Sequence, residues 1–274
     1  MKSTQISLVQ MQISYGRKDE NLEKTTEMIE RAISQAVPGV PHIVCLPELF
    51  STGYDLKNAK LHAETIPEGR TTKFLQQTAI DHSIVLLASY IECWNEKYYN
   101  TAVVIDTNGI LVGKYRKIHL FPIPIGTGNP PETTVFSIGE FYKSKTSFKT
   151  QSVNLGLLIC FDLRFPEISR RIVLEGKVDL LVYLAEFPHP RCAIWKRLLQ
   201  ARAMENQIFV CGVNSVGSDF NFCGGSVAYD PYGNVLIEGS AEKEEILTTQ
   251  LDPSLLKEVR TSLPSLKYRQ PNYY

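Results

Sequence analysis

Two side chains able to take part in nucleophilic chemistry each stand where an apolar stretch of the sequence ends. Cys160 directly follows VNLGLLI at 153–159, and Glu48 follows HIVCLP at 42–47. Such runs are typical of strands covered on both faces, and a turn from strand to helix can expose a thiol and direct backbone N–H groups at a reacting oxygen. Taken alone, Cys160 is more simply a small buried hydrophobic residue, so a catalytic role depends on partners elsewhere.

A thiol needs a base or a cation beside it to react near neutral pH, because its ordinary pKa is about 8.5. Glu48, at the end of a buried strand, would be partly desolvated, which raises the pKa of a carboxyl group and makes it a better base. Lys117 lies in GKYRKIHLF at 113–121, before a long Gly/Pro-rich passage. In isolation each charge is more simply solvated, but together they could supply a base and a cation for Cys160.

The order of these residues and the sequence segments around them resemble those of the nitrilase, or carbon–nitrogen hydrolase, superfamily. The resemblance is greatest to its omega-amidase-like and bacterial amidase branch. The resemblance is carried by LPELF at 46–50, KYRKIHLF at 114–121, LGLLICFDLRFPE at 155–167, WKRLLQARAMENQIFVCGVN at 195–214 and GGSVAYDPYGNVL at 224–236. It implies that Glu48 is the general base, that Cys160 is the nucleophile and that Lys117 stabilises the tetrahedral intermediate.

The resemblance also implies supporting residues around this triad. Glu132, in NPPETTVF at 129–136, would support the lysine and orient the substrate, with a surface loop charge as the alternative, and the backbone N–H of Phe161 would help to hold the oxyanion. Two readings remain open for the others. Tyr54 and Phe121 line the pocket or pack in the core, and Arg191 meets a substrate carboxylate or is a solvated or interface residue. The resemblance implies no metal and no cofactor.

Two charged residues follow the cysteine closely and need not be catalytic. Asp162 and Arg164 lie in the turn CFDLRFPE at 160–167. We expect them to be structural, bonded to each other or to nearby backbone, because the turn that presents the thiol must itself be held in place.

The pattern of expected elements favours an α+β fold. Apolar runs predict strands at 6–10, 42–46, 84–90, 153–159, 179–185 and 208–213, with hairpins around Thr-Asn-Gly at 107–109 and DPYGN at 230–234. We also expect helices at 21–36, 71–81, 166–175 and 192–206, the first of them with an amphipathic pattern. This mixture indicates mixed β-sheets with helices outside, and the resemblance implies a four-layer αββα sandwich. One domain over 1–274 is the simplest interpretation, with the tail from about 252 packed on a partner subunit.

Composition narrows the classes of partner. Lys+Arg 29 equals Asp+Glu 29, and there is no basic run, so nucleic acid and anionic membrane surfaces are not expected partners. We find no signal peptide and no apolar stretch long enough to span a membrane. The six cysteines are scattered without a CxxC pair, which argues against a zinc site and a disulfide framework and suits a reducing cytoplasm.

We therefore expect a cofactor-independent amidase that releases ammonia from a small ω-amide of a dicarboxylate or keto acid through a cysteine thioester. An N-carbamoyl amide hydrolase, which would also release carbon dioxide, is the alternative within enzymes. A non-catalytic interaction protein on the same fold and a metal-dependent hydrolase are the further alternatives. The resemblance implies a homodimer or larger homo-oligomer, paired through the helices that follow Cys160 and the later ARAMENQ segment.

Overall fold

The computed structural model describes residues 1–126, 128–140, 147–217 and 220–273, and its framework is a pair of six-stranded sheets. The first sheet has the order β14-β1-β2-β3-β4-β5, with β1–β2 and β2–β3 parallel and the other pairs antiparallel. Its strands are β1 (Thr4–Gln10), β2 (His42–Cys45), β3 (Val85–Trp94), β4 (Lys97–Ile105), β5 (Leu111–Arg116) and β14 (Glu245–Leu251).

The second sheet has the order β13-β12-β9-β8-β7-β6, with β7–β8 and β8–β9 parallel. Its strands are β6 (Ser147–Lys149), β7 (Asn154–Ile159), β8 (Leu180–Ala185), β9 (Phe209–Asn214), β12 (Val227–Tyr229) and β13 (Val235–Glu238). A short ribbon of β10 (Val216–Gly217) and β11 (Phe222–Cys223) stands apart from both sheets. The expected mixture of parallel and antiparallel strands is confirmed.

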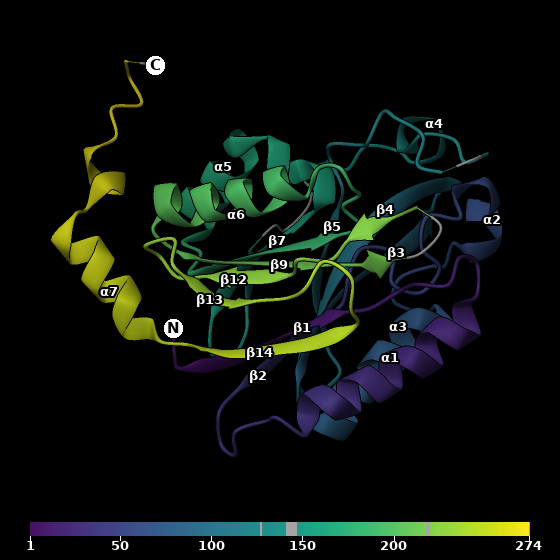
Figure 1. Cartoon of the computed structure of the whole chain (residues 1–274), viewed down its shortest axis with the longest axis horizontal. Helices are drawn as coiled ribbons and strands as arrows, with labels where there is room; N and C mark the ends of the chain where they lie inside the picture. The colour runs from purple at the N-terminus through teal and green to yellow at the C-terminus, as the bar shows by residue number, and fades with distance from the viewer. Residues whose placement is uncertain (127, 141–146, 218–219, 274) are drawn as a thin grey trace.

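Helices cover the outer face of each sheet (Figure 1). Helices α1 (Lys18–Ile33) and α3 (Arg70–His82) lie on the first sheet, and α5 (Pro166–Gly176) and α6 (Cys192–Asn206) lie on the second. Short elements η1 (Leu56–Asn58), α2 (Ala59–His62), α4 (Glu132–Val135) and η2 (Cys160–Arg164) sit in the connections. The arrangement is the four-layer αββα sandwich that the resemblance implied.

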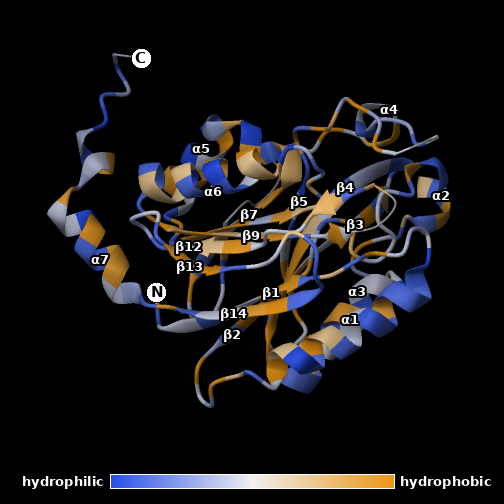
Figure 2. Ribbon diagram, viewed as in Figure 1, coloured by the Kyte–Doolittle hydropathy of each residue, from blue (hydrophilic) through white to orange (hydrophobic). Residues whose placement is uncertain are grey.

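Alternate residues of a strand pack into two different hydrophobic cores, one between the sheets and one under the outer helices. This explains why the apolar runs are nearly continuous. In β2, Ile43 and Cys45 face the second sheet, while Val44 packs with Leu22 and Ile29 of α1. A strand covered on both faces has no solvent side on which polar residues would be favoured. In Figure 2 the strands of both sheets are mostly hydrophobic, and the polar colours gather on the outer helices.

The end of the chain lies outside this sandwich. Helix α7 (Pro253–Ser262) and η3 (Ser265–Tyr268) run along one side of the sandwich, and the tail continues away from it (Figure 1). Leu256 and Val259 are buried, whereas Leu263 is 67% exposed and Tyr268 is 75% exposed. Within the described residues, no helix combines the length and the apolar character needed to cross a membrane.

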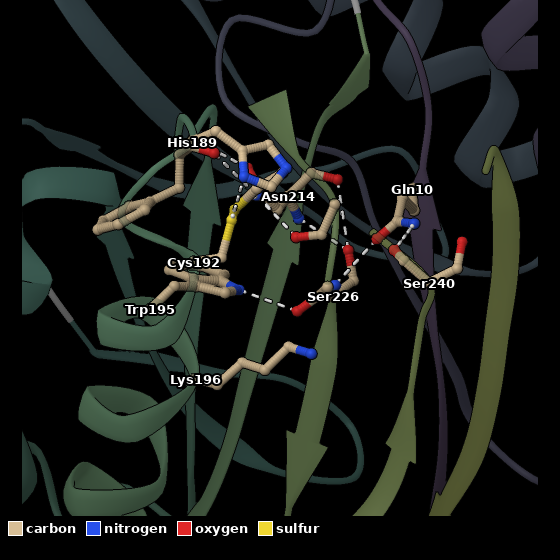
Figure 3. Close-up of a disulfide and its surroundings, with 12 residues drawn as sticks. Gln10, His189, Cys192, Trp195, Lys196, Asn214, Ser226 and Ser240 are labelled. Atoms are coloured by element: carbon tan, nitrogen blue, oxygen red, sulfur yellow. Dashed lines mark hydrogen bonds between the residues drawn. A yellow bond between two sulfur atoms is a disulfide. The ribbon is translucent and has the colours of Figure 1, made fainter. Parts of the chain in front are cut away.

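One pair of cysteines departs from the expectation of no disulfides. Cys192, at the start of α6, is bonded to Cys223 of β11, 31 positions later (Figure 3). The two segments meet because the loop after β8 runs beside β11. There the N–H of Cys223 donates to the carbonyl of Phe187 at 3.1 Å, and the N–H of His189 donates to that of Asn221 at 2.9 Å. Cysteine spacing carries no sign of such a tertiary contact.

Candidate active site

Residues that follow several strands come together at one edge of the sandwich. Glu48 comes three residues after β2 of the first sheet, and Cys160 immediately follows β7 of the second. The N–H of Glu48 donates to the carbonyl of Ala185, the last residue of β8, at 3.4 Å. Lys117 follows β5, and its N–H donates to the carbonyl of Asn100 on β4 at 2.9 Å. The site is therefore built across both sheets.

The thiol sits on a constrained turn. Cys160 has a φ of 43°, which non-glycine residues seldom adopt, which costs about 1–3 kcal/mol and which persists only where the surrounding structure holds it. Buried Asp162 imposes it, because its carboxylate accepts from the N–H of Ile159 at 3.0 Å, the hydroxyl of Tyr115 at 2.8 Å and the N–H of His119 at 3.2 Å. The expected structural role of Asp162 agrees with these contacts.

Lys117 lies between two carboxylates. Its Nζ donates to Glu48 Oε1 at 2.7 Å and approaches the two oxygens of Glu132 at 2.9 and 2.8 Å. Asn100 Nδ2 also donates to Glu48 Oε1 at 2.7 Å, and the hydroxyl of Tyr54 donates to Glu132 Oε1 at 2.9 Å. The side chains of Lys117, Glu48 and Glu132 are fully enclosed, so their charges are held by each other and not by bulk water.

The electrostatics favour a charged lysine and a neutral thiol. Burial alone would lower the pKa of Lys117, but the charges of Glu132 and Glu48 outweigh it and raise the pKa well above its usual range. Burial, and next the charge of Glu48, raise the pKa of the Cys160 thiol, against an opposing effect of Lys117. The thiol therefore holds its proton at neutral pH and needs a base to become a nucleophile. Glu48, whose charge acts on the thiol more strongly than that of any other group, stands in that place.

A cavity opens in front of the thiol. It is lined by Tyr54, Phe121, Ile125, Cys160, Phe161, Arg164, Glu186, Phe187, Pro188 and Arg191. The expectations that Tyr54, Phe121 and Arg191 lie at the pocket agree with this lining. The Arg191 guanidinium lies 5.4 Å from the centre of the Phe121 ring, and the N–H of Phe121 donates to Glu132 Oε2 at 2.7 Å. Arg164 lines the cavity and is not bonded to Asp162, unlike one of the arrangements expected for it.

Two residues near the triad were missed by the sequence reasoning. Asn100 comes from the middle of β4, where no local signal marks it as functional. Glu186 directly follows the buried strand β8, so the same strand-end signal that identified Cys160 and Glu48 would have found it. Its side chain is fully buried, and burial, with the charge of Glu48 second, raises the pKa of its carboxyl well above the usual range.

The described residues hold no cluster of histidine, cysteine, aspartate and glutamate suited to a metal ion. The chemistry available at the cavity is instead that of a thiol, a buried carboxylate beside it, and an ammonium held by a second carboxylate. Such a set suits nucleophilic attack on a carbonyl carbon, with the ammonium next to the oxygen that becomes negative.

Comparisons with known proteins agree with this chemistry. Residues 5–261 match the family model described as carbon–nitrogen hydrolase. The chain is 38% identical over 263 residues to the 2-oxoglutaramate amidase of Bacillus subtilis, covering 94% of this chain and 95% of that protein. A crystal structure of a Saccharomyces cerevisiae member of branch 10 of the nitrilase superfamily superimposes with a TM-score of 0.86 at 27% identity, covering 98% and 97% of the two chains.

A further similar structure is that of an amidase with a modified active-site cysteine. It is a mutant of the amidase from Nesterenkonia sp. AN1, which carries the acetamide moiety of fluoroacetamide added covalently at its active-site cysteine. This chain matches it with a TM-score of 0.79 at 26% identity, over 97% of both chains.

Proposed function

The chain belongs to the carbon–nitrogen hydrolase family and is an amidase, and from this premise we propose that it hydrolyses the ω-amide of a small dicarboxylate or oxo acid. The reaction releases ammonia and passes through a thioester on Cys160. The observation that carries the proposal is the enclosed Glu48–Lys117–Glu132 cluster beside the Cys160 thiol. The name of the Bacillus subtilis relative supports an oxo acid amide as substrate.

Acylation begins with a proton transfer. Glu48 takes the proton of the Cys160 thiol, and the sulfur attacks the amide carbon, so that a C–S bond forms while the carbonyl π pair moves to the oxygen. The oxyanion is held by Lys117, which is already an ammonium, and by the N–H of Phe161. The tetrahedral intermediate then collapses, the C–N bond breaks, and Glu48 returns the proton to the departing nitrogen, which leaves as ammonia.

Deacylation repeats the sequence with water. A water molecule takes the place of ammonia, and Glu48 removes one of its protons as the oxygen attacks the thioester carbon. The second tetrahedral intermediate breaks its C–S bond, and the sulfur recovers a proton from Glu48. The products are the free acid and the original thiol, so the enzyme needs neither metal nor cofactor.

The remaining predicted residues have positioning roles in this scheme. Glu132 holds Lys117 in place through the contacts at 2.9 and 2.8 Å, and Tyr54 donates to Glu132 at 2.9 Å. Arg191 lines the cavity together with Arg164. Two guanidinium groups in a small cavity suit the carboxylate at the far end of an ω-amide substrate.

An ammonia-release assay on a panel of primary amides, ω-amides, carbamoyl compounds and nitriles tests the proposal. We expect ω-amides of dicarboxylates or oxo acids to be turned over fastest and Cys160→Ala to be inactive. Carbon dioxide released in step with ammonia would identify an N-carbamoyl amide hydrolase instead. Hydrolysis that is unchanged in Cys160→Ala would refute the catalytic assignment.

We also propose that residues 1–274 form one domain that works in the cytoplasm as a homodimer or larger assembly. Cys160 is a free thiol, which suits a reducing compartment, whereas the Cys192–Cys223 bond would be reduced there. On α6, Ile194 and Met204 are 37% and 48% exposed, which supports pairing through the helices after Cys160. In the tail from about 252, α7 buries Leu256 in its own chain, and the exposed Leu263 and Tyr268 are the residues available to pack on the partner. Light scattering in solution tests the assembly, and a mass of one chain, 30.9 kDa, would refute it.

A further inference from the structure

One buried carboxyl group at the cavity has no role in the proposed mechanism. Glu186 lines the cavity with Cys160, and its side chain is fully buried. Neither Oε1 nor Oε2 of Glu186 has a hydrogen-bond partner among the described residues. Buried carboxyl groups are almost always paired, because an unpaired one loses its hydration without compensation. An unpaired buried carboxyl at a cavity therefore indicates that a bound molecule supplies the missing contact.

Glu186 lies directly beside the general base. Its backbone N–H donates to Glu48 Oε2 at 3.0 Å, and the preceding residue, Ala185, accepts from the N–H of Glu48. The departing nitrogen of the substrate must also lie beside Glu48, because Glu48 gives it a proton. Glu186 and the amide nitrogen are thus neighbours of the same carboxylate.

The other carboxylates near this position already have their donors. Glu48 Oε1 accepts from Lys117 and from Asn100 at 2.7 Å each, and Glu48 Oε2 accepts from the N–H of Glu186. When Glu48 carries the proton of the thiol, it acts toward the substrate as a donor. It is therefore poorly placed to accept an N–H of the amide as well.

Glu132 is equally occupied. Its Oε1 accepts from Lys117 and Tyr54 at 2.9 Å each, and its Oε2 accepts from the N–H of Phe121 at 2.7 Å. Asn100 Oδ1 is also unpaired, but Asn100, like Glu48 and Glu132, is not among the residues that line the cavity. Glu186 is the side-chain carboxyl group that lines the described cavity, and both of its oxygens have free acceptor capacity.

A primary amide brings two N–H donors into this enclosed space, and each loses water on binding. We propose that Glu186 is a substrate-positioning residue whose carboxyl oxygen accepts a hydrogen bond from the amide nitrogen of the substrate. The inference rests on the proposed amidase function and assigns recognition of the –NH₂ end to a specific side chain. A site built to bond an N–H discriminates against analogues that lack it, because its own polar group is then left unpaired.

The protonation state of Glu186 determines which substitution preserves the interaction. Burial, and next the charge of Glu48, raise the pKa of the Glu186 carboxyl well above its usual range, which favours the neutral form. A neutral carboxyl keeps one carbonyl oxygen as acceptor. Glutamine has nearly the same shape, no charge and the same carbonyl oxygen, so Glu186→Gln is the matched control for Glu186→Met, which removes the acceptor.

The experiment compares two substrates with the same acyl group. Ammonia release from the primary amide gives kcat/KM, and the burst of nitrophenolate from the p-nitrophenyl ester reports acylation of Cys160 without any N–H on the leaving group. We expect Glu186→Met to lower kcat/KM for the amide by about tenfold or more, because a buried hydrogen bond to the amide nitrogen is lost. The burst rate with the ester should stay within about twofold of the wild-type rate. Glu186→Gln should recover amide hydrolysis to within about threefold of wild type.

Each other result decides against the inference. Equal losses on amide and ester would mean that Glu186 only supports packing, and an unchanged amide rate in Glu186→Met would mean that it does not touch the nitrogen. If Glu186→Met fails to fold by thermal unfolding, Glu186→Ala, which cannot overfill the site, takes its place in the same comparison. Wild-type protein that releases no ammonia from any amide would instead refute the proposed function itself.

Discussion

Replacing Lys117 with methionine removes a buried ammonium while keeping an unbranched side chain of similar length. In the wild type, Lys117 Nζ lies 2.7 Å from Glu48 Oε1 and 2.8 Å from Glu132 Oε2, and all three side chains are fully enclosed. The variant therefore loses an oxyanion-stabilising cation and also leaves two buried carboxylates without a counter-charge. Both losses are measurable, and they have different signatures.

The catalytic loss follows from the oxyanion. Removing one preorganised donor at a developing oxyanion costs about 10²–10³ in rate, which corresponds to about 2.7–4 kcal/mol of transition-state stabilisation. We expect kcat/KM of Lys117→Met for the best ω-amide to fall by at least about a hundredfold. The assay is ammonia release under saturating and limiting amide. A loss of about tenfold or less would mean that Lys117 only positions its neighbours.

The stability loss depends on pH with a definite sign. Breaking a buried ion pair from one side costs about 3–5 kcal/mol. Burial raises the pKa of Glu132, and Lys117 opposes that rise, so the folded-state pKa increases further without the lysine. Between the unfolded value of about 4.3 and this raised value, the native state binds the proton more tightly, so the free energy of unfolding falls as pH rises.

Chemical denaturation at several pH values measures this loss. We expect the deficit of Lys117→Met relative to wild type to be smaller at about pH 5 than at about pH 8, because the proton then replaces the lost cation. Lys114→Met, on the same strand β5, is the matched control: Lys114 is partly exposed, and its buried partner Glu92 keeps two bonds from Arg116, so this variant should lose less stability than Lys117→Met. A deficit independent of pH would refute the reasoning.

Two further substitutions give three predictions. Glu48→Gln should abolish turnover with the fold intact by circular dichroism, and near-normal ammonia release would exclude Glu48 as the base. Because burial and next the charge of Glu48 raise the pKa of the Cys160 thiol, the same variant should form thiolate at a lower pH than wild type. Thiolate absorbance, with Cys160→Ala as the blank, measures this, and an unshifted midpoint would contradict it. Arg191→Gln should raise KM about tenfold or more for a carboxylate-bearing ω-amide, as expected for a lost charge-assisted bond, and should leave KM for a neutral amide nearly unchanged. An equal change for both amides would place Arg191 outside substrate recognition.

Local patterns in the sequence were sufficient to locate the strand ends that carry Glu48 and Cys160. A strand covered on both faces must be apolar along its length, so the position where the apolar run stops is visible without any tertiary information. The same holds for α6, which spans Cys192–Asn206 as its pattern indicated. The start of α1 was less visible in the sequence: the helix begins at Lys18, three residues before the expected start at 21. Asn21 lies inside the helix, where its buried side chain donates to the backbone carbonyls of Ser14 and Ser51.

The functional contacts themselves were decided by the packing of one sheet on the other. Glu48 and Cys160 come from different sheets, and Asn100 reaches Glu48 from the middle of β4, where no local pattern distinguishes it from a core position. The Cys192–Cys223 bond depends in the same way on a loop that meets β11. Sequence periodicity records which face of an element is buried. It does not record which side chain of another element lies opposite. Here the packing of the two sheets determines that Glu48 and Glu132 share Lys117 and that Glu186 lines the cavity.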